Sequence, residues 1–182
     1  LLGADGVVLA RQAQQSHGAN MLNLHRSIPA VLLPREAAQI QELVRIAGRH
    51  RVALYPVSTG RNWGYGSALP VRDNQVLVDL SRLNRILDFD PGTGVVGVEP
   101  GVTQQILADF LTQHGHEFMV PVTGAGPQAS LLGNALERGW GITPRADHFL
   151  AVTALEAVLP DGSLYRSALA EAGAAEIGRV FK

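Results

Sequence analysis

The sequence predicts an α+β fold built from two lobes. An apolar run ending at Pro34, an amphipathic segment and a β-rich run at 52–57 follow one another, which is the order of a strand–helix–strand unit. From about residue 85, apolar runs are separated by short Pro/Gly turns, a pattern typical of antiparallel hairpins. We therefore expect a βαβ-containing lobe over about 1–84 and a lobe of mainly antiparallel strands with helices over about 85–182, with the boundary near 84–86.

The first lobe is expected to begin with 27 irregular residues. "SIPAVLLP" (27–34) then predicts a strand, and "VALYPV" (52–57) predicts a second strand paired with it in parallel. Between them lies a predicted helix with Pro34 in its first turn. "QVLVDLS" (75–81) predicts a further strand. The helix is expected to bury one apolar stripe, made of Ala37, Ile40, Val44 and Ala47.

The second lobe is expected to contain two hairpins and two helices. "RILDFD" and "VVGVEPG" flank the turn "PGTG", and a second pair of strands flanks "PDGS" within 151–167. Thr103 is a predicted N-cap of a helix that ends near Gly115, and 123–141 contains a short helical stretch. The first of these helices is expected to bury four apolar side chains, those of Ile106, Leu107, Phe110 and Leu111.

Composition limits the functional classes. A net charge of −1 over 182 residues gives no electrostatic reason to expect nucleic acid or an anionic membrane. The absence of cysteine excludes disulfides, cysteine-ligated metal and a thiol nucleophile. No run approaches the roughly 18 apolar residues of a membrane span, and the first residues lack a signal-peptide pattern. We expect a soluble protein of the cytoplasm or periplasm, of which this chain is a fragment.

The loop "STGRNWGYG" (58–66) follows a predicted strand. Its glycines permit positive φ and close approach of the main chain to a ligand, and successive N–H groups can form an anion-binding concavity. The guanidinium of Arg61 adds donors, and Ser58, Thr59 and Asn62 add neutral ones. These are the groups that bind a pyrophosphate, although the loop matches neither a Walker A loop nor a Rossmann fingerprint. A tight surface turn is the alternative.

A second glycine-rich loop, "TGAGPQASLLGNALERGWG" (123–141), has the same character. Gly124 and Gly126 free the backbone, and Ser130 precedes a short helix whose first N–H groups favour an anion. The remaining small residues would allow a flat ligand to pass against the main chain; they are Gly133, Asn134, Gly139 and Gly141. The alternative is a helix packed closely on a sheet.

In their order, "VSTGRNWGYG", "VEPGVT", "SLLGNALERGWGITPRADHF" and "ALEAVLPDG" resemble flavoproteins of the p-cresol methylhydroxylase/vanillyl-alcohol oxidase superfamily, above all the 4-alkylphenol-oxidising branch. The resemblance runs from about Ile28 to Arg166. It implies two α+β lobes with FAD extended between them. The first loop would cover the pyrophosphate, and the second loop with the following hairpin would hold flavin, ribitol and adenine.

The resemblance also implies site residues. Tyr65 matches the tyrosine that hydrogen-bonds a substrate phenolate, and Trp63 matches an aromatic of some relatives. The alternative for Tyr65 and Trp63 is a packed aromatic pair beside the turn. His148, next to Asp147, is a candidate to lie beside the cofactor, and a structural histidine is its alternative. The matches to the pyrophosphate loop are Ser58, Thr59, Gly60, Arg61, Asn62, Gly64 and Gly66. The matches to the "EPG" turn and the second loop are Pro100, Gly101, Ser130, Gly133, Asn134, Gly139 and Gly141.

Three departures accompany the resemblance. Vanillyl-alcohol oxidase-like members carry an acidic residue before Ser130, whereas this sequence reads "VTGAGPQ", without a carboxylate. Arg145 replaces an aromatic in the motif around Asp147 and His148. We expect that the substrate domain, which in the family carries the covalent flavin ligand when there is one, and the last segment of the FAD domain lie outside this sequence.

The function implied by the resemblance is transfer of a hydride from a 4-alkylphenol or benzylic alcohol to flavin N5, with Tyr65 favouring the phenolate. A cytochrome or oxygen would accept the electrons, and the full-length protein could be a homodimer. The isolated fragment is expected to be inactive. Two alternatives are a FAD-dependent oxidoreductase acting on a 2-hydroxy acid or sugar, and a non-catalytic flavin or nucleotide binding module.

Other polar residues give weaker indications. The six histidines lack metal-ligand spacing, so no metal site is expected. Asp88 and Asp90 would share one face of a strand and are expected to be solvated. Ser58 and Ser130 lack the Gly-x-Ser-x-Gly elbow of a hydrolase.

Overall fold

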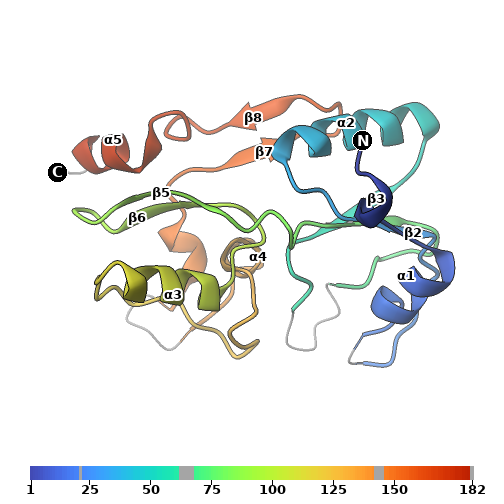
Figure 1. Cartoon of the computed structure of the whole chain (residues 1–182), viewed down its shortest axis with the longest axis horizontal. Coiled ribbons are helices and arrows are strands. Elements are labelled where there is room, and N and C mark those ends of the chain that lie inside the picture. Colours follow the sequence, from blue (N-terminus) through green and yellow to red (C-terminus); the bar gives the residue numbers. More distant parts are fainter. Residues whose placement is uncertain (21, 62–67, 142–145, 181–182) are drawn as a thin grey trace. The chain divides into compact units, whose positions relative to one another are not determined.

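The computed structural model describes residues 1–20, 22–61, 68–141 and 146–180 and shows a mixture of helices and of parallel and antiparallel strands (Figure 1). The predicted α+β class is therefore confirmed. The chain forms two compact units: unit 1 comprises Leu1–Leu83 and Val158–Leu164, and unit 2 comprises Asn84–Ala157 and Tyr165–Lys182. Among the described helices, none combines the length and apolar character needed to cross a membrane.

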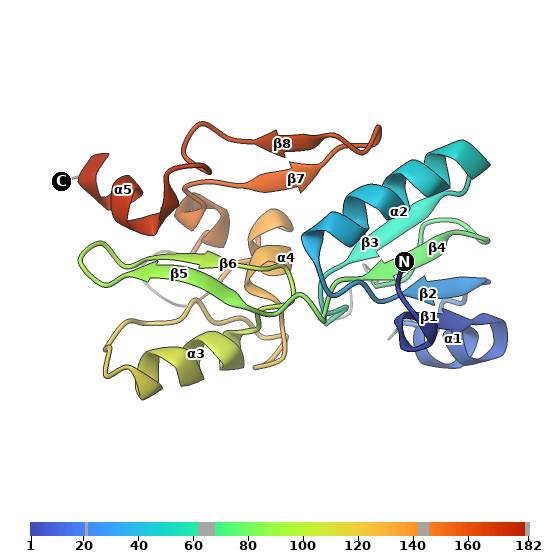
Figure 2. The ribbon, with the colours of Figure 1, turned by 45° about the horizontal axis from the view of Figure 1, so that its top comes forward.

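Unit 1 is built on a four-stranded sheet with the order β1-β2-β4-β3 (Figure 2). The strands are β1 (Val7–Leu9), β2 (Ala30–Leu32), β3 (Leu54–Val57) and β4 (Val76–Asp79). β1 is antiparallel to β2, whereas β2 and β3 are each parallel to β4. The prediction that the strands around α2 pair with each other is therefore wrong. They run in the same direction, but β4 lies between them because strand order depends on long-range pairing that local sequence does not encode.

Helix α2 (Ala37–His50) begins at a capping box. The Glu36 side chain accepts a hydrogen bond from the Gln39 N–H, and the Gln39 side chain accepts one from the Glu36 N–H. This box fixes the helix start after Pro34, so the prediction that Pro34 lies in the first turn is wrong. The buried positions are Leu43 and Ala47. Of the four residues predicted for the apolar stripe, Ala47 is buried, Ile40 and Val44 are half-buried, and Ala37 is exposed, which is a wrong prediction; Leu43 was not predicted.

The expectation of an irregular N-terminus is also wrong. A short 3-10 helix η1 (Ala4–Gly6) and β1 precede helix α1 (Ala10–His17). This helix has one buried residue, Ala13, and no side-chain N-cap, so neither an apolar stripe nor a cap marked it in the sequence. Tertiary hydrogen bonds hold it instead: the Gln14 side chain donates to the Arg26 carbonyl (2.7 Å) and accepts from the Ile28 N–H (3.1 Å).

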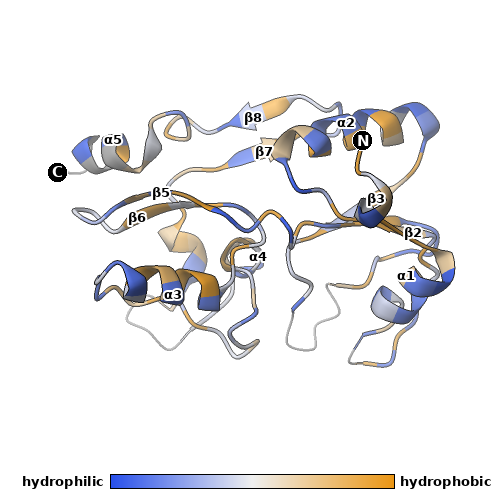
Figure 3. Ribbon diagram, in the orientation of Figure 1, coloured by the Kyte–Doolittle hydropathy of each residue, from blue (hydrophilic) through white to orange (hydrophobic). Residues whose placement is uncertain are grey.

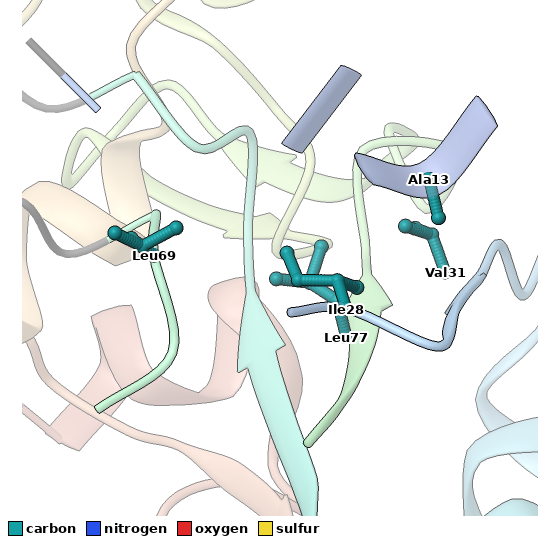
Figure 4. Close-up of a cluster of buried hydrophobic side chains, with 5 residues drawn as sticks. All are labelled: Ala13, Ile28, Val31, Leu69 and Leu77. Atoms are coloured by element: carbon teal, nitrogen blue, oxygen red, sulfur yellow. The ribbon is translucent and has the colours of Figure 1, made fainter. Parts of the chain in front are cut away.

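The core of unit 1 lies on the face of the sheet that α1 covers. It consists of Ala13, Ile28, Val31, Leu69 and Leu77 (Figure 4). Tyr55 and Val57 of β3 pack against this cluster. Because side chains alternate along a strand, Asp79 lies on the same face as Leu77, at the end of β4.

Unit 2 begins with the predicted first hairpin, which is confirmed. β5 (Ile86–Asp90) and β6 (Val95–Val98) pair antiparallel. Helix α3 (Gln104–Gln113) follows, and the Thr103 hydroxyl accepts a hydrogen bond from the Ile106 N–H at 3.2 Å, which confirms the predicted N-cap. Figure 3 shows hydrophobic and hydrophilic residues interspersed along α2 and α3, as expected for helices with one buried face.

The remaining elements are α4 (Leu131–Leu136), a 3-10 helix η2 (His148–Ala151), β7 (Glu156–Val158), β8 (Leu164–Arg166) and α5 (Gly173–Val180). The predicted short helix and second hairpin are therefore confirmed. The expectation that Asp88 and Asp90 are merely solvated is wrong. Asp88 accepts from the Ala174 N–H in the first turn of α5 (2.7 Å), and Asp90 accepts from the Thr93 hydroxyl (2.7 Å).

Candidate cofactor site

The first glycine-rich loop leaves β3 at Ser58. Gly60 has φ +65°, a conformation that favours glycine, and Arg61 is exposed. Within the described part of the chain, no hydrogen bond or ion pair engages the Arg61 side chain. Its guanidinium donors are thus available to an anion. The predicted site residues Asn62, Trp63, Gly64, Tyr65 and Gly66 lie outside the described residues.

A contact between Asp79 and His17, which the sequence did not indicate, lies at the origin of this loop. Asp79 is opposite Val57 in the β3–β4 pairing, so its carboxylate stands where both strands end. Its Oδ2 is 3.5 Å from His17 Nε2, and its Oδ1 accepts from the Ser81 N–H at 2.8 Å. Burial raises the pKa of Asp79, but the hydrogen bonds from His17 and Ser81 outweigh burial and hold that pKa below its usual range.

In unit 2, the "EPG" turn and the second loop are joined through Ser130. Its hydroxyl donates to the Pro100 carbonyl (2.7 Å) and accepts from the Gly133 N–H (3.0 Å), and the residue is 3% exposed. The Leu131 N–H donates to the Val102 carbonyl at 3.0 Å. The sequence predicts that N–H groups at the start of α4 bind an anion. Two of them, those of Leu131 and Gly133, instead donate hydrogen bonds within the protein.

A second residue missed by the sequence, Gln104, holds the beginning of this loop. Its side chain is buried and donates to the Thr123 hydroxyl at 3.0 Å. Thr123 in turn accepts from the Ala125 N–H (3.2 Å). Gly126 has φ +87°, and Gly124 is exposed. A glutamine on the apolar face of an amphipathic helix is the sequence signal that could have indicated this contact. Which face of the helix is buried is known only once the fold is known, so the signal could not be used.

Asn134 and His148 form a second group at the end of the loop. His148, 4% exposed, donates from Nδ1 to the Asn134 Oδ1 at 2.5 Å. The main chain of Gly139 bonds to both residues: its N–H donates to the Asn134 carbonyl (2.8 Å), and its carbonyl accepts from the His148 N–H (3.2 Å). A Cβ at Gly141 would lie 2.5 Å from His148 Nε2 and 2.7 Å from the Val122 carbonyl oxygen. Gly141 is thus required by packing within the protein.

The base of the "EPG" turn contains an ion pair between the buried Glu99 and the exposed side chain of Arg85. The Glu99 side chain, 8% exposed, accepts from the Arg85 N–H (2.8 Å) and from the Arg85 guanidinium (2.7 and 3.1 Å). The Val102 N–H closes the turn on the Glu99 carbonyl at 3.0 Å. Burial raises the pKa of Glu99, but its hydrogen bonds and charge interaction with Arg85 outweigh burial and hold that pKa below its usual range.

The structure therefore brings the predicted residues together as three groups. Ser58, Thr59, Gly60 and Arg61 follow β3 in unit 1. Pro100, Gly101, Ser130 and Gly133 form one cluster in unit 2, and Asn134, Gly139, Gly141 and His148 form another. Within the described residues, no group of three His, Asp or Glu side chains could hold a metal ion.

This chain belongs to the FAD binding domain family, whose model matches residues 28–168. FAD is the cofactor of that family. The predicted p-cresol methylhydroxylase-type fold is confirmed by the crystal structure of p-cresol methylhydroxylase with substrate bound, which matches with a TM-score of 0.88 and 32% identity over 92% of this chain and 33% of that one.

Two further proteins are similar to this chain in sequence. The hydroxylating 4-cresol dehydrogenase flavoprotein subunit of Pseudomonas putida is 32% identical over 100% of this chain and 36% of its own length. The 1'-carboxy-chondrochloren decarboxylase of Chondromyces crocatus is 44% identical over 84% of this chain and 28% of its own length. The chain thus spans about a third of the length of these relatives.

The close approach at Gly141 predicts that Gly141→Ala destabilises the protein by about 1–3 kcal/mol, because the Val122 carbonyl is main chain and cannot rotate away. Gly48→Ala in α2 is the matched control. No atom lies within 4 Å of a Cβ placed there, so this variant should be as stable as the wild type or more stable by up to about 1 kcal/mol. Urea unfolding followed by circular dichroism measures both. Equal stability of the two variants would contradict the packing role of Gly141.

The Glu99–Arg85 pair predicts a loss of stability in acid. The folded-state pKa of Glu99 is lowered, so its contribution is complete above the unfolded value of about 4.3 and is lost as pH falls through the folded value. Glu99→Gln should cost about 2 kcal/mol at pH 7 and should reduce the acid dependence of unfolding. The exposed Glu117→Gln is the control, with no such change expected. An unaltered acid dependence in Glu99→Gln would exclude this role for the pair.

Proposed function

We propose that the protein containing this chain is a FAD-dependent oxidoreductase that takes a hydride from a 4-alkylphenol or a benzylic alcohol. The similarity to p-cresol methylhydroxylase along nearly the whole chain carries this proposal. The remainder of such a protein would contribute the substrate domain, and a cytochrome or oxygen would accept the electrons.

The described residues fit FAD at its most demanding group, the charged diphosphate. The segment Ser58–Arg61 combines a glycine at positive φ with an exposed guanidinium that no described residue engages. A planar guanidinium matches phosphate oxygens with paired donors. In unit 2, the Ser130 hydroxyl, Asn134 Oδ1 and His148 Nδ1 are already bonded within the protein, so the groups left for a ligand are main-chain groups of the second loop and the His148 Nε2, which has no partner among the described residues.

Bound FAD would supply the acceptor for the hydride. The residues of this chain bind and orient: Arg61 would hold the diphosphate, and Tyr65 would hydrogen-bond the phenol oxygen of the substrate. The segment from Thr123 to Ala129 contains no carboxylate, so any general base must come from another part of the protein.

The relative from Chondromyces crocatus favours a second candidate, a flavin-dependent decarboxylation, because it is more similar in sequence than the 4-cresol dehydrogenase subunit. The two candidates differ in their products. Release of carbon dioxide from a carboxylated aromatic substrate, without turnover of 4-alkylphenols, would favour decarboxylation. Turnover of 4-alkylphenols or benzylic alcohols would favour the first candidate, whereas turnover of 2-hydroxy acids or sugars alone would exclude both.

The proposal predicts that Arg61→Ala weakens FAD binding by the intact protein at least tenfold, the effect of losing one charge-assisted hydrogen bond of about 1.5–3 kcal/mol. The exposed Arg72→Ala, also in unit 1, is the matched control and should bind FAD as the wild type does. Titration of the apoprotein with FAD, followed by flavin fluorescence, measures both affinities. Unchanged affinity in Arg61→Ala would argue against the diphosphate role of the first loop.

The role proposed for Tyr65 predicts an effect confined to phenols. Tyr65→Phe should lower kcat/KM for 4-alkylphenols by about tenfold or more, since one hydrogen bond to a charged oxygen is lost. Benzylic alcohols without a phenol hydroxyl should be oxidised at the wild-type rate. Tyr165→Phe, a change at a tyrosine that is 47% exposed, is the control and should affect neither class. Equal losses for both substrate classes in Tyr65→Phe would contradict a contact with the phenol oxygen.

A further inference from the structure

We propose that His17 and Asp79 form a charge-balancing pair that keeps the end of β4 electrically neutral for an anionic diphosphate bound at Ser58–Arg61. The inference rests on the proposed function, because the diphosphate is that of FAD. It adds two residues with an electrostatic role that neither the sequence pattern nor the family resemblance indicated.

The Asp79 carboxylate lies at the end of β4. Carboxyl ends of parallel strands meet at one edge of a sheet, which is where ligands bind in such folds. Val57 and Asp79 end β3 and β4 and lie opposite each other, and the Leu80 N–H extends this pairing by donating to the Val57 carbonyl at 2.9 Å. Ser58, the first residue of the loop, follows directly. The Asp79 carboxylate is therefore fixed at the base of the proposed anion-binding segment.

An ionised carboxylate at this place is unfavourable for an anionic ligand unless it is compensated. The Asp79 side chain is 14% exposed, so water screens its charge poorly. Its hydrogen bond from Ser81 and its contact with His17 favour the ionised form over the neutral acid. The carboxylate thus requires a cation close by, and His17 is the residue that meets it.

The contacts of His17 can accommodate its charged form. The Ser16 hydroxyl lies 2.9 Å from the Gln12 carbonyl and 2.6 Å from His17 Nδ1, so with its proton on Gln12 it can accept from an Nδ1–H group. The Asp79 Oδ2 opposite Nε2 is also an acceptor. An imidazolium with two N–H groups would satisfy both contacts, and in that form His17 would neutralise Asp79.

Replacement of His17 should weaken FAD binding only while the Asp79 carboxylate is present. His17→Gln leaves the charge of Asp79 uncompensated and should weaken FAD binding by the intact protein roughly fivefold, the effect of one partly screened charge. Asp79→Asn removes the repelling charge and should leave FAD affinity unchanged or up to several-fold tighter. The double variant should return to within about twofold of the wild type. His50→Gln, an exposed histidine at the end of α2, is the matched control.

FAD titrations of these variants at low and at high salt test the pair. A loss in His17→Gln that shrinks at high salt and is restored by Asp79→Asn supports it, because a purely structural role would show neither behaviour. Wild-type affinity in His17→Gln, or a loss that Asp79→Asn does not restore, overturns the inference while leaving the proposed function intact. If His17→Gln does not fold, weaker FAD binding by Asp79→Asn alone overturns it. Failure of the wild type to bind FAD would instead overturn the proposed function.

Discussion

The buried hydroxyl of Ser130 is the interaction on which the cofactor region of unit 2 depends. It donates to Pro100 and accepts from Gly133, so one side chain joins the turn after β6 to the first turn of α4. The main-chain bond from Leu131 to Val102 and the Gln104 side chain add to the same connection. A hydroxyl without these partners would be costly to bury, because both the donor and the acceptor would lose water. The second loop is therefore held by bonds within the protein before any ligand arrives.

Polar side chains also contact one another within the protein at the end of that loop and in unit 1. Asn134 accepts from His148 Nδ1, and Gly141 leaves room for the imidazole, whose buried Nε2 has no hydrogen-bond partner among the described residues. In unit 1, His17 and Asp79 meet beside the origin of the first loop, whereas Arg61 extends from it without a partner in the described residues. Polar side chains with internal partners thus hold the loops, whereas the Arg61 guanidinium has no partner among the described residues. This division fits the proposal that the first loop binds an anionic group of FAD.

Local signals in the sequence were sufficient for much of this architecture. Both hairpins, the N-cap at Thr103 and the helix over 37–50 follow from turn residues, a cap and an apolar period, all of which act over a few residues. The N-terminal helix was missed because Ala13 alone is buried on it. The insertion of β4 between β2 and β3 was missed because strand order is decided by pairing between distant segments. For the same reason, the partners of Ser130, Glu99 and Asp79 could not be read from the sequence, although the two glycine-rich loops could.

The central claim is that this chain binds FAD, with the first loop on its diphosphate. Extraction of the cofactor from the purified intact protein, with identification by mass spectrometry, tests this most directly. The account predicts FAD, in about one copy per chain. Protein that is folded but carries no flavin and takes none up, or that holds FMN in preference to FAD, would contradict it, because FMN lacks the diphosphate that the loop is proposed to bind.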